Sequence, residues 1–148
     1  MAELPNPSRF CFGCGTENPH GLQMQFRAED GRAVASYTPP QHLQGYPGRA
    51  HGGCVATMLD EAMGWAVYGQ GIWAVTVRIT TRFRKPVRLG EPITVRGWVT
   101  RDRGRFLELR GELRSSRDAL LAEADGMFVR VSGEQAEEMR RFYEASLP

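Results

Sequence analysis

The sequence is poor in the features that mark several classes of protein. Its three cysteines are too few, and odd in number, for a disulfide scaffold. It has no apolar run long enough to span a membrane and no basic-then-apolar leader. Its formal net charge of +2 points to no particular partner, and no continuous basic face with stacking aromatics suggests a nucleic-acid-binding protein. We therefore expect a soluble, cytoplasmic protein with one domain over residues 1–148.

Two of the cysteines have the spacing of metal ligands. Cys11 and Cys14 form a Cys-x-x-Cys pair, and His20 follows as a possible third ligand. Structural zinc normally needs four protein ligands, and no second pair follows in the sequence. The favoured interpretation is a tight turn of small residues with Phe10 and Phe12 packed against the core. We therefore predict no metal.

The periodicity of the apolar residues predicts the secondary structure. Alternating residues indicate strands, and a recurrence every three or four residues indicates a helix. One long helix against a curved antiparallel sheet is an α+β layered domain. The expected elements are an irregular lead-in over 1–21, strands at 22–27 and 32–37 around a turn at 29–31, a helix from the glycine pair at 52–53 to 68, closed by glycines at 69–71, strands at 73–84, 93–101, 105–115 and 119–131, and a short C-terminal helix or tail over 134–148.

The expected central helix begins at a glycine pair, Gly52-Gly53. The first backbone N–H groups of a helix lack intrahelical partners and lie at the positive end of its dipole. Such a donor suits the developing oxyanion of a reacting carbonyl, and glycine lets a ligand approach the backbone closely. The alternative is that both glycines serve only close helix packing. The residues that form the apolar face of this helix are Val55, Leu59, Ala62 and Ala66.

Two adjacent acids on this helix differ in their expected surroundings. Asp60 lies roughly 100° from the centre of the apolar face and borders an apolar wall, whereas Glu61 lies near the opposite side. A carboxylate at such a border suits a general base. For Asp60, a catalytic and a solvated role remain equally open. For Glu61, we expect a solvated position on the outer face.

The spacing along the helix also constrains any shared chemistry. Gly52 and Asp60 are eight residues apart, hence about 12 Å apart along one helix axis. One carbonyl cannot contact both groups within one subunit. If both act on the same carbonyl, two antiparallel copies of the helix must lie side by side across a dimer axis.

Several motifs together resemble a known family. They are Cys-Phe-Gly-Cys-Gly, Asn-Pro and Gly-Leu within 11–22, Gln-Gly-Tyr-Pro-Gly and His-Gly-Gly within 44–53, Asp60, and Thr76 followed by Arg-Lys-Pro-Val at 84–87. The chain is similar to hotdog-fold proteins, and more closely to PaaI-type acyl-CoA thioesterases. The resemblance implies a curved antiparallel sheet wrapped around one central helix, in a homodimer or a tetramer. It also implies metal-independent hydrolysis of an acyl-CoA thioester to free acid and CoA, with coenzyme A only as part of the substrate.

The resemblance also implies roles for individual residues. The backbone N–H of Gly52, with Gly53 next to it, polarises the thioester carbonyl. Asp60 of the partner subunit activates water or attacks directly. Thr76 orients the water or the carboxylate, although a threonine in a strand is more often a plain β-branched residue.

Further residues are expected around the substrate. His51 shapes the helix start, and Gln44 stands where many relatives carry an asparagine. Arg84 and Lys85 are candidates for the phosphates of coenzyme A, since cationic side chains suit phosphate groups. The aromatic residues of this region fit either a core or an acyl pocket. They are Trp65, Tyr68 and Trp73.

Other functions remain as alternatives. The same fold could bind acyl-CoA without turnover. A hydratase-type hotdog enzyme usually carries an Asp-x-x-x-x-His pair, but Asp60 is followed five residues later by Trp65. A zinc-dependent role at the cysteine pair ranks third. Nothing in the sequence selects the acyl group.

Overall fold

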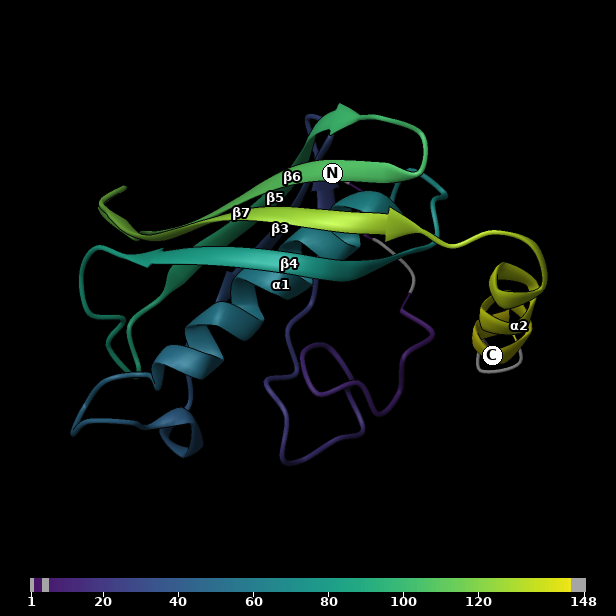
Figure 1. The fold of residues 1–148 in the computed structure, drawn as a ribbon. Coiled ribbons are helices and arrows are strands. Elements are labelled where there is room, and N and C mark those ends of the chain that lie inside the picture. The colour runs from purple at the N-terminus through teal and green to yellow at the C-terminus, as the bar shows by residue number, and fades with distance from the viewer. Residues whose placement is uncertain (1, 4–5, 145–148) are drawn as a thin grey trace.

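A computed structural model of the chain describes residues 2–3 and 6–144, and within them one curved antiparallel sheet surrounds a long helix (Figure 1). The strand order is β1-β2-β3-β5-β6-β7-β4, with every neighbouring pair antiparallel. The strands are β1 (Ala2–Glu3), β2 (Arg27–Glu29), β3 (Arg32–Tyr37), β4 (Ala74–Phe83), β5 (Ile93–Asp102), β6 (Phe106–Ser115) and β7 (Leu120–Arg130). The helices are the 3-10 helix η1 (Gln41–Leu43), α1 (Gly52–Tyr68) and α2 (Gly133–Glu144).

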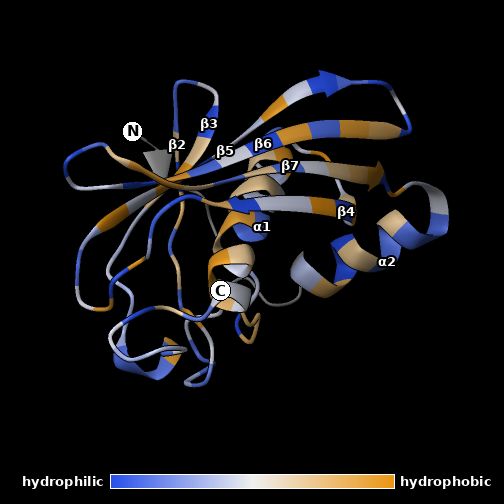
Figure 2. Cartoon of the chain, turned by 60° about the vertical axis from the view of Figure 1, so that its left-hand side comes forward, coloured by the Kyte–Doolittle hydropathy of each residue, from blue (hydrophilic) through white to orange (hydrophobic). Residues whose placement is uncertain are grey.

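Helix α1 provides the centre of the hydrophobic core. Its apolar face packs against the inner side of the sheet, and Figure 2 shows hydrophobic and hydrophilic segments alternating along the strands. At Gly97 in β5, an added Cβ would lie 2.3 Å from the Ala62 carbonyl of α1. The helix backbone therefore rests directly on the sheet at this glycine. The buried residues of α1 are Val55, Met58, Leu59, Ala62, Met63, Trp65, Ala66 and Val67.

Most predicted elements are confirmed to within one or two residues. The helix begins at the glycine pair and ends at Tyr68, and the five longer strands lie where the alternation placed them. Gly69 keeps right-handed helical geometry, and the left-handed residue that ends this segment is Gly71, at φ +75°. Within the part of the chain that the structure describes, no helix has the length and apolar content needed to cross a membrane. The expected C-terminal tail at 145–148 lies outside the described residues.

The predicted strand at 22–27 is wrong. The backbone N–H groups of Leu22 and Met24 donate to the carbonyls of Phe12 and Gly13 in the lead-in, so no neighbouring strand pairs with them. Gln23 lies in the left-handed region at φ 56°, which interrupts an extended strand. The alternation still marks burial, since Leu22, Met24 and Phe26 are buried. Only β2 forms, and the lead-in contributes its partner strand β1.

The packing expected of the lead-in aromatics is also wrong. Phe10 and Phe12 are 67% and 50% exposed, whereas Cys14 between them and α1 is buried. Hydrogen bonds such as that from the Gly15 N–H to the Cys11 carbonyl shape this turn, and it places its sulfur atoms beside Glu61 of α1 and its phenyl rings in solvent. The lead-in follows the surface of α1 (Figure 1).

Strand β4 forms one end of the sheet. Its partner on one side is β7, and within residues 2–3 and 6–144 no strand pairs with its other side. The register with β7 shifts between Thr76 and Arg78, which places Val77 in a bulge. Val75, Val77 and Phe83 on this strand are exposed. An open edge with exposed apolar residues is a surface that proteins normally cover.

Candidate active site

The two residues that the resemblance places beside the reacting water contact each other. Thr76 Oγ1 in β4 donates a hydrogen bond of 2.7 Å to Asp60 Oδ1 in α1. The helix presents Asp60 at the border of its apolar face, and β4 runs beside it. Asp60 is partly buried. The hydroxyl fixes one carboxylate oxygen and leaves the second oxygen to accept a hydrogen bond from water.

Asp60 and Thr76 line a pocket of about 370 Å³ with an aromatic wall. Trp65 and Tyr68 of α1 stand edge to face, with ring centres 5.1 Å apart. Tyr68 contacts Trp73 at 5.6 Å, and Trp73 stacks on Tyr143 of α2 at 5.4 Å. All four rings line the pocket. The sequence did not identify Tyr143 as a pocket residue, because the polar pattern of the C-terminal helix does not indicate that this helix packs against the aromatic wall.

The start of α1 offers one free donor. His51 is the N-cap, and its Nδ1 accepts the N–H of Gly53 at 2.9 Å. The His51 carbonyl accepts the N–H groups of Cys54 and Val55. No acceptor among the described residues binds the N–H of Gly52. Of the glycine pair, Gly52 is therefore the residue with an available N–H, and His51 shapes the helix start as expected.

A groove of about 800 Å³ surrounds this helix start, and Gln44, His51, Gly52, Arg84 and Lys85 all line it. Gln44 Oε1 accepts hydrogen bonds from the Gly48 N–H and from Gln41, so its amide holds its own loop together. Arg84 is paired with Glu123 in β7 at 3.1 Å.

The basic residues differ in whether they already form ion pairs with acidic side chains. Glu123 also binds Arg110, and neighbouring arginines of the sheet bind Asp125, Glu112 and Asp102. Lys85 makes no ion pair within the described part of the chain. Lys85 is thus the more available cation beside the groove.

The structure separates the two halves of the expected site. Gly52 lines the groove but not the aromatic pocket, and Asp60 lines the aromatic pocket but not the groove. This separation agrees with the spacing of about 12 Å along the helix. One subunit alone does not bring the Gly52 N–H and the Asp60 carboxylate to one carbonyl.

Residues 47–122, about half of the chain, match the family model of the thioesterase superfamily. The chain belongs to the thioesterase superfamily. It is 33% identical over 110 residues to the acyl-coenzyme A thioesterase THEM4 of Xenopus laevis, covering 73% of this chain and 49% of that protein. The chain spans about half the length of the curated relatives it matches.

The fold of this thioesterase-superfamily chain is similar to that of solved structures. The crystal structure of a thioesterase superfamily protein superposes with a TM-score of 0.78 at 30% identity, over 82% of this chain and 60% of that one. The E. coli PaaI protein from the phenylacetic acid degradation operon has a TM-score of 0.70 at 23% identity, over 76% of this chain and 82% of that one. The hotdog fold and the resemblance to PaaI-type proteins are confirmed.

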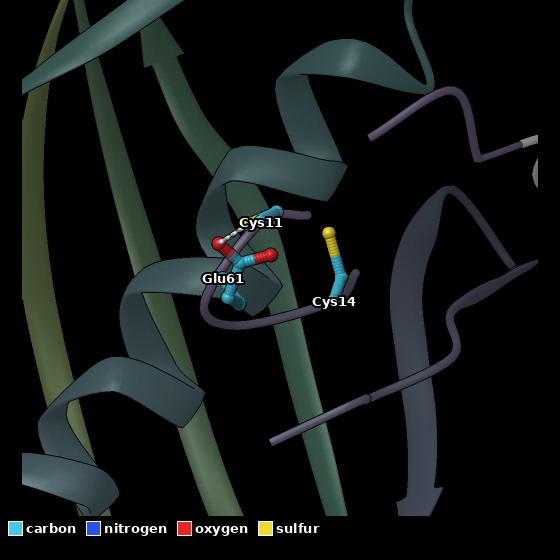
Figure 3. A group of neighbouring side chains, drawn as sticks. All are labelled: Cys11, Cys14 and Glu61. Carbon is cyan, nitrogen blue, oxygen red and sulfur yellow. Dashed lines mark hydrogen bonds between the residues drawn. The ribbon is translucent and has the colours of Figure 1, made fainter. Parts of the chain in front are cut away.

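A second cluster, which the sequence did not predict, lies in the same pocket of this superfamily member. The Cys11 and Cys14 thiols and the Glu61 carboxylate converge within 4.8 Å of one another (Figure 3). The solvated position expected for Glu61 is therefore wrong, because the lead-in packs over that side of α1. His20, which the sequence offered only as a possible third ligand, is exposed and does not belong to this cluster.

The surroundings of the cluster change its acid–base properties. Burial raises the pKa of Glu61 to about 8, and the neighbouring Cys11 adds to the rise. A hydrogen bond from Cys14 lowers the pKa of Cys11 to about 5, and backbone hydrogen bonds from Cys14 and Gly13 act in the same direction. The same pairing and burial raise the pKa of Cys14. The signal available in the sequence was the glycine between the cysteines, which allows a close approach.

Proposed function

We propose that this chain hydrolyses an acyl-CoA thioester to free acid and CoA, at a site shared between two subunits. The observation that carries the proposal is the hydrogen bond from Thr76 to Asp60 in a pocket, together with the free Gly52 N–H at the start of the same helix. The matched relative that is named an acyl-coenzyme A thioesterase supports the reaction class.

The proposed chemistry uses groups of the protein alone. The Asp60 carboxylate accepts a proton from water as the water oxygen attacks the thioester carbonyl, or attacks that carbon itself. The Gly52 N–H of the partner subunit donates to the carbonyl oxygen as it becomes an oxyanion. Collapse of this intermediate breaks the C–S bond, and the CoA thiolate leaves with the electron pair and takes up a proton from Asp60 or from water. If Asp60 has attacked directly, water then hydrolyses the resulting mixed anhydride, which releases the free acid and restores the carboxylate.

The proposed dimer pairs the open edge of β4. Two β4 strands that extend the sheet would cover the exposed Val75 and Val77. The bond between Thr76 and Asp60 shows that α1 lies beside this edge. A dimer axis at β4 would therefore bring two α1 helices together, as a shared site requires.

The groove at the helix start is the proposed binding site for the coenzyme A part of the substrate. It leads from Gly52 to Lys85 and Arg49, whose positive charges suit phosphate groups. Arg84 would first have to leave Glu123. The cytoplasmic location, the absence of a metal requirement and a tetramer remain predictions.

The test is release of CoA thiol from acyl-CoAs that range from short chains to long chains and aryl groups. We expect Asp60→Asn to lower kcat by at least about 100-fold, because it removes the proposed base. Turnover near that of the unaltered chain would remove Asp60 from the mechanism. Tight acyl-CoA binding with no thiol release over the whole panel would instead indicate a binding protein.

The helix start allows a matched pair of variants. Gly52→Pro removes the N–H but suits the first turn of a helix, and His51 already has the extended geometry that precedes proline, at ψ 139°. Gly52→Ala keeps the N–H, and its Cβ would meet only the Phe83 ring, at 3.7 Å. We expect about a 100-fold loss of kcat for the proline variant and little change for alanine. Equal activity of both variants would exclude the Gly52 N–H as donor.

A further inference from the structure

The Cys11, Cys14 and Glu61 side chains form a group whose chemistry the proposed hydrolysis does not use. The two sulfur atoms come from the turn of the lead-in, and the carboxylate comes from the middle of α1. Residues far apart in the sequence thus bring three metal-binding atoms together, and Figure 3 shows the three side chains gathered in one place.

The distances fit a tetrahedral ion. Cys11 Sγ lies 3.5 Å from Glu61 Oε1, and all three donor atoms lie within 4.8 Å of one another. Ligand atoms bound to Zn²⁺ at its usual bond lengths are roughly 3.5–3.8 Å apart. Small side-chain rotations would therefore bring all three atoms to bonding distance of one ion.

The turn holds the two sulfur atoms in place. The Gly15 N–H donates to the Cys11 carbonyl at 2.8 Å, and Asn6 Nδ2 donates to the Cys14 carbonyl at 2.7 Å. At Gly13, an added Cβ would lie 2.1 Å from Glu61 Cγ. Only glycine lets the turn approach the carboxylate this closely.

The carboxyl group of Glu61 has no cationic side chain as a partner in the described part of the chain. Among the residues that the structure describes, no lysine, arginine or histidine forms an ion pair with this carboxyl group, whereas eleven ion pairs link other acids to basic side chains. Withdrawal from water without a cation favours the protonated form of this carboxyl group, and a divalent ion would stabilise the ionised form in its place.

We propose that Cys11, Cys14 and Glu61 bind a thiophilic divalent ion of the zinc class, which fixes the lead-in to α1. The protons that the two thiols and the Glu61 carboxyl group still hold are released to solvent on binding, so the ion is held by two thiolates and one carboxylate. These three residues line the same pocket as Asp60, and a water molecule from that pocket supplies the fourth ligand. Thiolates favour zinc over magnesium or calcium.

The test uses the reduced, full-length chain with Zn²⁺ alone, and Co²⁺ as a spectroscopic probe. We expect one Zn²⁺ per chain and a thiolate-to-cobalt charge-transfer band. Cys11→Ser should remove the band, and Glu61→Gln, which keeps the size of the side chain, should weaken Zn²⁺ binding at least about tenfold. Cys54→Ser, at a cysteine outside the cluster, should change neither.

A second measurement, the thermal unfolding midpoint with and without Zn²⁺, keeps the proposal testable if one variant folds poorly. Zn²⁺ should raise the thermal midpoint of the unaltered chain and of Cys54→Ser, but not that of Glu61→Gln. Three results would overturn the proposal. They are no Zn²⁺ binding by the reduced chain, Zn²⁺ binding by Glu61→Gln and Cys11→Ser as tight as that of the unaltered chain, or a Cys11–Cys14 disulfide in metal-free protein that excludes the ion. None of these readouts depends on thioester hydrolysis.

Discussion

The hydroxyl of Thr76 is the residue-scale feature on which the orientation of Asp60 depends. A hydrogen bond to a carboxylate contributes about 1.5–3 kcal/mol. We expect Thr76→Val, which keeps the shape and the strand preference, to lower kcat about tenfold or more with little effect on KM. Thr76→Ser keeps the hydroxyl, and its kcat should be within about threefold of that of the unaltered chain. Steady-state kinetics of both variants would check this, and equal kcat values would exclude a role for the hydroxyl.

Adjacent acids show what the sequence reveals at this scale and what it does not. The position of Asp60 beside an apolar wall follows from the helical period of its own segment. The environment of Glu61 does not, because the atoms that cover it belong to Gly13 and the two cysteines, about fifty residues earlier. Helical periodicity predicts which residues of one helix share a face, but it does not predict which distant loop packs over that face.

At the scale of elements, Tyr37 ties β3 to the stretch from Leu22 to Phe26. Its hydroxyl donates to the Leu22 carbonyl at 2.6 Å. We expect Tyr37→Phe to destabilise the fold by about 1 kcal/mol near neutral pH, because the hydrogen bond is lost. Tyr46→Phe is the matched control, since Tyr46 is 82% exposed, and its effect should be within about 0.5 kcal/mol. Chemical denaturation of the three proteins measures both values.

The stability difference at Tyr37 should also depend on pH. Burial raises the pKa of Tyr37 from 10.0 to about 12. Below pH 10 the phenol keeps its proton in both states, so its contribution is complete. As pH rises from 10 to 12, the unfolded chain loses the proton first, and this contribution is lost. The difference in the free energy of unfolding between the unaltered chain and Tyr37→Phe should therefore shrink from pH 8 to pH 11. A constant difference would contradict the raised pKa of Tyr37.

Strands differed in how well alternation predicted them. The runs that became β5, β6 and β7 pair with long neighbours, so alternating burial and backbone pairing coincide. In β4 the backbone pairs with β7 as well, but its side chains are exposed or half-buried. In the stretch from Leu22 to Phe26 the side chains alternate between core and solvent, but the backbone bonds to the lead-in. Alternation reports which side chains are buried, and the backbone partner must be learned from the structure.

At the scale of the whole molecule, the shared site makes a quantitative prediction. Asp60→Asn and Gly52→Pro should each be nearly inactive alone. When the two variants are mixed and allowed to exchange subunits, half of the dimers pair one variant with the other, and each such dimer has one intact site of two. We expect the mixture to recover about one quarter of the activity of the unaltered chain. No recovery after exchange, shown by tagged subunits, would place both groups in one subunit.

The dimer itself could be argued from the sequence only through the helix geometry. The distance from Gly52 to Asp60 implied a second subunit, and the family resemblance supplied the pairing of subunits. The surface that could pair was not evident, because the alternation of β4 does not show which strand lies at the end of the sheet. That position follows from the order of the strands, in which β4 joins β7 and leaves its other edge open.

Thr76 stands beside the bulge at Val77, on the strand whose outer edge is open. The residue that orients Asp60 thus belongs to the surface that a second subunit would cover. Association and catalysis would then share one thermodynamic equilibrium, and dilution below the dissociation constant should reduce the specific activity of each chain.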